Sequence, residues 1–210
     1  MVCDMQIDGA GEIEKYRFYP SVMYSHARLT YNQVADMLAN PQGENAQQFA
    51  AVLPHINHLY SLFQKLLQAR AKRGAIDFET VETQMIFNEQ GKIERIIPVV
   101  RNDAHKLIEE CMLAANVCAA GFLHEHEHPV LYRVHEGPTP EKLEAVREFF
   151  KEFGLQLGGG DEPEAADYSK LLKQIKGRPD AGLLQTVMLR SLRQARYCPD
   201  NVGHFGLGYE

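Results

Sequence analysis

One stripe of a predicted helix carries the polar side chains that could do chemistry. The segment RNDAHKLIEECMLAANVCAA, residues 101–120, is charged at its start, and Asn116 is the only polar side chain in its second half. At 100° per residue, His105, Glu109 and Asn116 share one stripe. A helix that is apolar all round is buried all round, so this stripe must face polar partners. We expect either an internal hydrogen-bond network or a ligand channel there, with Glu110 in solvent.

A histidine-rich segment, HEHEH at 124–128, raises the question of a metal site. Alternating ligands would suit a strand, but these residues lie at the end of the predicted helix. Neighbours two apart on a helix point about 200° apart and cannot share one ion. We therefore predict no metal site in this segment. His135 and His204 have no Ser or Cys nucleophile motif beside them, so no hydrolase triad is predicted either.

Composition and charge limit the function classes. The 210 residues are 45% hydrophobic and 24% charged, enough for a sizeable core. The formal net charge of -6 argues against a small basic module that binds nucleic acid by charge alone. Two basic stretches, KLLQARAKR (65–73) and RSLRQAR (190–196), could still form a local basic track.

Location follows from the apolar runs and the cysteines. The apolar run at 111–123 is shorter than the roughly 18 residues that cross a bilayer, so no membrane partner is expected. The start of the chain lacks the basic and apolar regions of a signal peptide. The four cysteines are widely spaced without a CxxC motif. We expect reduced, buried thiols and a cytoplasmic protein.

The predicted elements mix hairpins with helices. Alternating residues predict strands at 1–7, 13–23, 75–78, 83–88, 92–99 and 130–135. Apolar spacing of three and four residues predicts helices at 30–38, 46–73, 101–127, 139–154, 167–175 and 180–196. Pro54 offers a second possible start for the long helix. The predicted class is α+β, with antiparallel strands and hairpins packed around a long buried central helix.

Six segments spread over nearly the whole chain carry a further signal. They are SHARLTY (25–31), RGAIDFE (73–79), the central helix segment at 101–120, RVHEGPT (133–139), LLQTVMLRSLRQARY (183–197) and GHFGLG (203–208). In this order and spacing they resemble the catalytic RNB domain of the ribonuclease II / ribonuclease R exoribonucleases, and the ribonuclease R branch more closely.

The resemblance implies an activity and three site residues. Members of this family degrade single-stranded RNA processively from the 3′ end to nucleoside 5′-monophosphates, in a channel with a magnesium-dependent acidic cluster. Phe78 resembles the aromatic that closes one end of the base stack, a contact that tolerates any base. Tyr31 and Glu109 resemble the pair that recognises the ribose, whose 2′-hydroxyl both donates and accepts. The Glu109 stripe is then expected to face the RNA channel, and Asn116 to be structural.

Two motifs of that family are missing from this chain. No DxDD motif precedes the first hairpin, and no SPIRR-like stretch follows GHFGLG. We expect residues 1–210 to be an internal portion of the catalytic domain, truncated at both ends and without the catalytic metal ligands. The parent enzyme would need Mg²⁺, whereas this fragment would bind none and be inactive. Self-association through surfaces exposed by truncation is also expected.

A noncatalytic RNA-binding or scaffold protein built on the same domain is the alternative. The genomic reading frame separates the two hypotheses. The enzyme hypothesis requires it to continue into a DxDD motif on one side and an SPIRR-like motif on the other.

Overall fold

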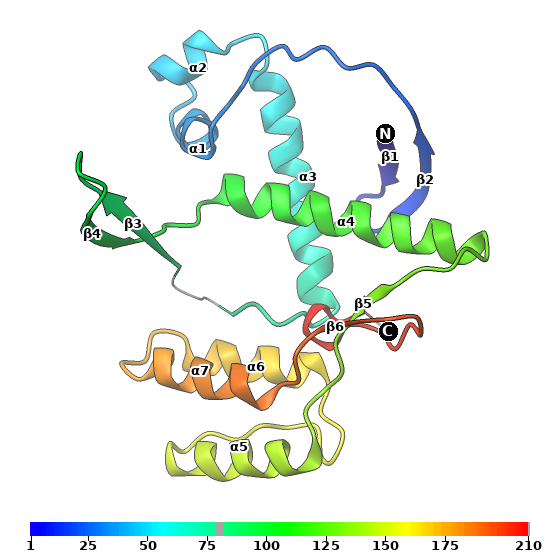
Figure 1. The fold of residues 1–210 in the computed structure, drawn as a ribbon, viewed down its shortest axis with the longest axis vertical. Coiled ribbons are helices and arrows are strands. Elements are labelled where there is room, and N and C mark those ends of the chain that lie inside the picture. Colours follow the sequence, from blue (N-terminus) through cyan, green and yellow to red (C-terminus); the bar gives the residue numbers. More distant parts are fainter. Residues whose placement is uncertain (79–81, 210) are drawn as a thin grey trace. The chain divides into compact units, whose positions relative to one another are not determined.

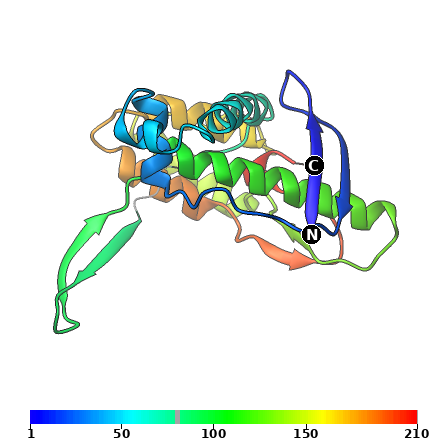
Figure 2. The ribbon, with the colours of Figure 1, turned by 90° about the horizontal axis from the view of Figure 1, so that it is seen from above.

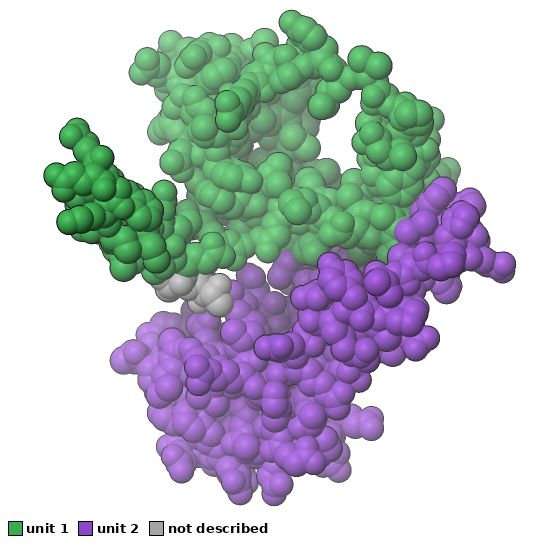
Figure 3. All heavy atoms as spheres, in the orientation of Figure 1, with its two compact units in different colours: residues 1–68, 80–121 green, residues 69–79, 122–210 purple. Residues whose placement is uncertain are grey.

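The computed structural model describes residues 1–78 and 82–209, which form two compact units (Figures 1 and 3). Unit 1 comprises residues 1–68 and 80–121, and unit 2 comprises residues 69–79 and 122–210. Helix α3 (Leu53–Lys72) and helix α4 (Asp103–Glu125) each begin in unit 1 and end in unit 2. In the described residues, each sheet is a pair of antiparallel strands among helices. The predicted α+β class is therefore confirmed.

Both predicted N-terminal and central hairpins are present in unit 1. Strand β1 (Val2–Ile7) pairs with β2 (Ile13–Tyr19), and β3 (Thr83–Phe87) pairs with β4 (Ile93–Pro98). Figure 2 shows β1 and β2 beside the second half of α4. A Cβ added at Gly121 of α4 would lie 3.1 Å from the Tyr16 hydroxyl, so a small residue is needed where this hairpin approaches the helix.

The long helix predicted at 46–73 is two helices. Helix α2 (Glu44–Gln48) ends before a turn, and α3 begins at Leu53 with Pro54 in its first turn. Pro54 suits this position because an N-terminal helical residue has no intrahelical partner for an N–H group. The alternative helix start at Pro54 is thus correct to within one residue. The prediction of one continuous helix over residues 46–73 is wrong.

Helix α4 is only partly buried, which corrects the prediction of burial on all sides. Ala104, Leu107, Ala114 and Cys118 form its buried side. Three large apolar side chains of the same helix are exposed: Ile108, Met112 and Val117. Glu110, expected in solvent, is 6% exposed, and Asn116, expected to be buried, is exposed. The composition of a helix does not show which side its neighbours cover.

The length argument against a membrane span does not hold for the whole helix. Among the described residues, α4 is the one helix long and apolar enough to cross a bilayer by length and composition. The sequence prediction considered only the apolar run at 111–123, which by itself is too short to cross a bilayer. A single helix of this kind is weak evidence for a membrane, because core helices pass the same test.

Unit 2 contains a contiguous apolar core. It is built by α5 (Pro140–Glu152), α6 (Ala165–Ile175) and α7 (Ala181–Ser191). Thr139 caps α5 by accepting from the backbone N–H of Lys142. Phe150 and Tyr168 are fully buried at its centre. The Tyr168 hydroxyl meets the Ser191 hydroxyl at 3.3 Å, so its polar end is satisfied.

Two short segments of unit 2 differ from the prediction. Residues 75–78 form no strand, although the Ile76 N–H donates to the Gly206 carbonyl at 2.9 Å. The helix predicted to reach 196 ends at Ser191, and Arg196–Cys198 is strand β6, paired with β5 (Tyr132–Val134). A three-residue strand depends on its distant partner, so local periodicity does not reveal it.

Candidate nucleic-acid interface

Tyr31 is the first residue of helix α1 (Tyr31–Ala39) in unit 1. Thr30 caps this helix, and Gln33 completes a capping box through its side chain. The two reciprocal hydrogen bonds hold the first turn, and therefore the backbone of Tyr31, in a defined orientation. The Tyr31 side chain is 45% exposed, so it remains accessible to a ligand.

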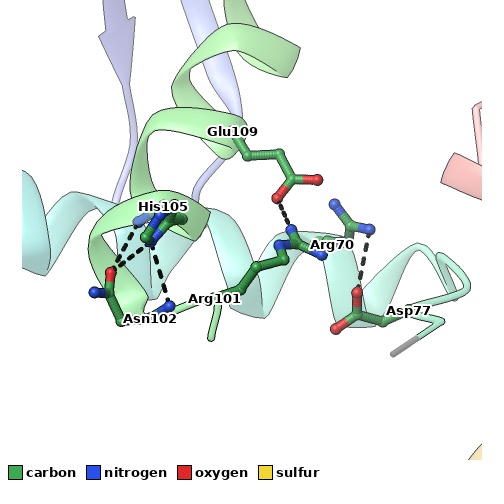
Figure 4. A network of polar contacts seen from close by, with 6 residues as sticks. All are labelled: Arg70, Asp77, Arg101, Asn102, His105 and Glu109. Carbon is green, nitrogen blue, oxygen red and sulfur yellow. Dashed lines mark hydrogen bonds and ion pairs between the residues drawn. The ribbon is translucent and has the colours of Figure 1, made fainter. Parts of the chain in front are cut away.

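His105, in the first turn of α4, orients the Tyr31 ring. The two rings stack with centroids 4.0 Å apart and planes inclined by 23°. Asn102 holds the imidazole through its side-chain oxygen, 2.8 Å from Nδ1 (Figure 4). The amide of Asn102 also donates to the Asn32 side chain at 3.4 Å, next to Tyr31. Two segments far apart in the sequence thus fix one aromatic ring.

Glu109 lies one helical turn after His105, on the same side of α4. Its carboxylate forms an ion pair with Arg101, which points toward it in Figure 4. Both side chains keep contact with solvent, at 31% for Arg101 and 46% for Glu109. The structure therefore places the Tyr31 ring against His105 and places Glu109 one turn further along α4, with its carboxylate paired to Arg101.

Phe78, the third predicted site residue, belongs to unit 2. Its half-buried ring packs against the apolar core formed by α5, α6 and α7. The preceding residue, Asp77, meets Arg70 of α3 at 3.7 Å (Figure 4), and Ile76 is bonded to Gly206. These contacts hold the extended segment that carries Phe78.

A pocket of about 710 Å³ opens beside Phe78, within unit 2. Four cationic side chains line it, and no carboxylate of the described residues does: Arg133, Lys142, Arg190 and Arg193. Its apolar wall includes Ile76, Leu189 and Leu192. An aromatic ring next to a group of cations is a combination that suits a base and a phosphate.

Two histidines, His135 and His204, lie in the wall of this pocket. The His135 Nδ1 accepts from the Gly206 N–H at 3.0 Å, and its Nε2 donates to the Arg193 carbonyl at 2.8 Å. His204 lies with its ring centroid 5.1 Å from that of His135. Burial, together with the nearby His135, lowers the pKa of His204. The pair serves as a structural support, and the structure adds no nucleophile to it.

Only two of the four cationic side chains of the pocket come from a stretch that the sequence marks as basic. The basic stretch at 190–196 supplies Arg190 and Arg193, whereas Arg133 and Lys142 come from other elements. In the other stretch, 65–73, the two arginines have internal partners: Arg70 pairs with Asp77, and the Arg73 guanidinium lies 4.4 Å from the Tyr209 ring centroid. Its two lysines are exposed. Spacing alone could not separate these two roles.

The remaining chemistry-bearing residues have structural contacts. His124 Nδ1 meets the Tyr132 hydroxyl at 3.2 Å, and His126 Nδ1 meets the Phe122 carbonyl at 2.8 Å. The four cysteines are free thiols, of which Cys118 and Cys198 are buried. The prediction of buried thiols therefore holds for these two, whereas Cys3 and Cys111 are only half-buried.

The whole chain matches the RNB domain family, over residues 1–210. Ribonuclease R of Vibrio cholerae is 52% identical over 207 residues, covering 99% of this chain and 25% of that protein. Ribonuclease R of Escherichia coli is 46% identical over 210 residues, covering 100% and 26%. Mycoplasma genitalium RNase R, solved in complex with ribose methylated single-stranded RNA, superimposes with a TM-score of 0.91 at 27% identity, covering 99% and 32%. The chain thus spans about a quarter of the length of the curated relatives it matches.

Proposed function

Because the chain belongs to the RNB domain family, we propose that it is part of the catalytic domain of a processive 3′-to-5′ exoribonuclease that hydrolyses single-stranded RNA to nucleoside 5′-monophosphates. The observation that carries this proposal is the similarity to ribonuclease R along the full chain, at 46–52% identity to two such enzymes. The chain contributes part of the wall of an RNA channel.

Tyr31 and Glu109 read the ribose in this proposal. A phenol and a carboxylate can both bond a 2′-hydroxyl, which donates and accepts, and DNA lacks that group. The stack on His105 and the ion pair with Arg101 support the assignment, because both hold the reading groups before RNA arrives. Both side chains are also accessible.

Phe78 supplies a stacking surface for a base. Base–aromatic stacking is worth about 1–3 kcal/mol and is independent of sequence, which suits an enzyme that degrades any RNA. The position of Phe78 at the edge of a cationic pocket supports this role.

Magnesium belongs to the parent enzyme in this proposal, and the residues described here do not fit a site for it. In residues 1–78 and 82–209, no group of three His, Cys, Asp or Glu side chains lies close enough to hold a metal ion. Metal-assisted phosphodiester cleavage needs carboxylates that hold the ions in place. We therefore expect the isolated chain to bind RNA without cutting it.

Labelled single-stranded RNA tests both parts of the proposal. The purified chain with Mg²⁺ should leave the RNA intact and bind it with an affinity that falls as salt rises. It should prefer RNA over DNA of the same sequence, and Glu109→Gln should reduce that preference. Glu94→Gln, an exposed change on β4, is the matched control. Equal binding of RNA and DNA would contradict the ribose-reading role, and progressive release of monophosphates would contradict the expected inactivity.

A further inference from the structure

The hairpin formed by β1 and β2 lies with one face against helix α4. Cross-strand partners in an antiparallel pair point to the same side of a sheet, and so do residues two apart in one strand. Cys3 pairs with Phe18, and Tyr16 lies two residues before Phe18, so all three share a side. The Tyr16 hydroxyl lies 3.1 Å from the position of a Cβ added at Gly121 of α4. The face that carries Cys3 is therefore the one that meets α4, beside which the hairpin lies in Figure 2.

Cys118 lies on the side of α4 that this hairpin approaches. It comes three residues before Gly121, and residues three apart are neighbours on one side of a helix. Its side chain is 1% exposed, so the surrounding segments exclude solvent there. The Cys118 thiol shares a hydrogen bond with the thiol of Cys3. Two cysteines that are far apart in the sequence thus meet inside unit 1.

The contact between Cys3 and Cys118 is that of two thiols poised to join. A disulfide requires side chains that are directed toward each other, and a shared hydrogen bond already directs these two. In the described residues β1 pairs with β2 alone. The other edge of β1 therefore has no ladder hydrogen bonds that resist a small shift toward α4. Both cysteines are free thiols in this structure, which is the reduced state of the pair.

The two thiols differ in their access to a dissolved reagent. Cys3 is half-buried and Cys118 is buried, so a reagent reaches Cys3 first. Burial and the neighbouring Cys3 raise the pKa of Cys118 to about 11, which lowers its thiolate fraction. Its reaction with a modified Cys3 is nevertheless intramolecular. A partner held in place has a far higher effective concentration than a dissolved thiol, which offsets the low thiolate fraction.

We propose that Cys3 and Cys118 form a reversible disulfide when the chain meets a small disulfide oxidant such as oxidised glutathione. The Cys3 thiolate attacks one sulfur of the oxidant, breaks its S–S bond and releases one glutathione thiolate. The Cys118 thiolate then attacks the Cys3 sulfur of the mixed disulfide and displaces the second glutathione. The two protein thiols lose two electrons and two protons, and the oxidant is reduced to two thiols. Neither step involves RNA, so the proposal is independent of the proposed function.

The disulfide fastens the first hairpin to α4 and should stabilise the fold. A cross-link that closes a long loop removes conformational freedom mainly from the unfolded chain. The melting temperature of the oxidised chain should therefore rise by about 5–15 °C. Dithiothreitol should return it to the value of the reduced chain, because the exchange is reversible.

Mass spectrometry of the folded chain after treatment with oxidised glutathione tests the proposal. The intact mass should fall by about 2 Da, because two thiol hydrogens are lost. An unreduced digest should join the peptides that carry Cys3 and Cys118, and dithiothreitol should separate them. The same treatment in urea should give mixed pairings, because the folded contact is then absent. A folded chain that keeps glutathione on Cys3, or that joins other cysteines, would overturn the proposal.

Cysteine variants assign the bond to this pair. A chain with both Cys111→Ser and Cys198→Ser should still lose the two hydrogens and gain the melting shift. Cys111 is half-buried like Cys3 but lies two helical turns from Cys118, so it should not enter the bond. Cys3→Ser and Cys3→Ala should each abolish the shift, and their melting under reducing conditions shows whether they are folded. A melting shift that persists in either folded variant would contradict the assignment.

Discussion

The ring of Tyr31 lies flat on the ring of His105, with centroids 4.0 Å apart and an angle of 23° between the planes. This stack joins the first residue of α1 to the first turns of α4, where Glu109 follows one turn later. His105 therefore acts as a positioning residue for the phenol that the proposed function assigns to the ribose.

Removing the imidazole of His105 should allow the Tyr31 ring to adopt other orientations. Stacked aromatic pairs contribute about 0.5–1.5 kcal/mol, so His105→Ala should lower the preference for RNA over DNA about two- to tenfold. Fluorescence anisotropy with RNA and DNA of one sequence measures the preference. His105→Phe should restore it, because a ring is returned. His58→Ala, an exposed histidine on α3, is the control. A full preference in His105→Ala would contradict the positioning role.

Gly74 should tolerate no side chain. Its φ is +78°, and a Cβ there would lie 2.7 Å from the Ala166 Cβ and 2.9 Å from its Cα. Gly154 has φ +67° with no atom within 4 Å of an added Cβ, so it isolates the conformational cost alone. We expect Gly154→Ala to lower the free energy of unfolding by about 1 kcal/mol and Gly74→Ala by about 2–4 kcal/mol. Urea unfolding measures both, and equal losses would mean that the contact with Ala166 relaxes freely.

The Cys118 thiol should react slowly and make stability depend on pH in the alkaline range. Burial and the neighbouring Cys3 raise the pKa of Cys118 to about 11. The thiolate is the reactive form, so near neutral pH its fraction is roughly a hundredfold below that of an ordinary cysteine. Iodoacetamide labelling followed by mass spectrometry should modify Cys118 much faster after unfolding than before.

The same raised pKa gives the sign of the pH effect. The folded state holds the proton more strongly than the unfolded state, so this contribution is fully present below the unfolded pKa. It is lost as pH rises through the ordinary thiol pKa toward about 11. Unfolding curves should show this alkaline loss, and Cys118→Ala should reduce it. A loss of equal size in the variant would assign the pH dependence to other groups.

The β3–β4 hairpin should promote self-association. Met85 pairs with Ile96 and Phe87 with Ile93, and all four side chains are at least half exposed. Exposed apolar groups of this kind favour association because contact removes them from water. Sedimentation velocity should show association that increases with concentration, and Phe87→Ser with Ile96→Thr should reduce it. Leu183→Ser, an exposed leucine on α7, is the control. A wild-type chain that is monomeric at all concentrations would refute this expectation.

Local patterns were enough to predict most of the elements. Alternation marked the two hairpins of unit 1, and Thr30 and Thr139 marked the starts of two helices. These features depend on neighbours within a few residues, since side-chain period and capping are local properties. The resemblance to an exoribonuclease domain could also be recognised in the sequence, because its motifs are short and keep their order along the chain.

Tertiary structure decided which sides of the elements are covered. In the folded chain Glu110 is buried and Asn116 is exposed. The last predicted helix ends early, and Arg196–Cys198 pairs with β5 instead. Each outcome depends on a segment far away along the chain.

The sequence by itself determined the family, the α+β class and the identity of Tyr31, Phe78 and Glu109 as residues worth testing. Only the tertiary structure decided that His105 stacks on Tyr31 and that Arg133 joins Arg190 at one pocket. The physical reason is that periodicity specifies the direction of a side chain relative to its own helix or strand. The partner that it meets is set by the packing of segments that are distant in sequence.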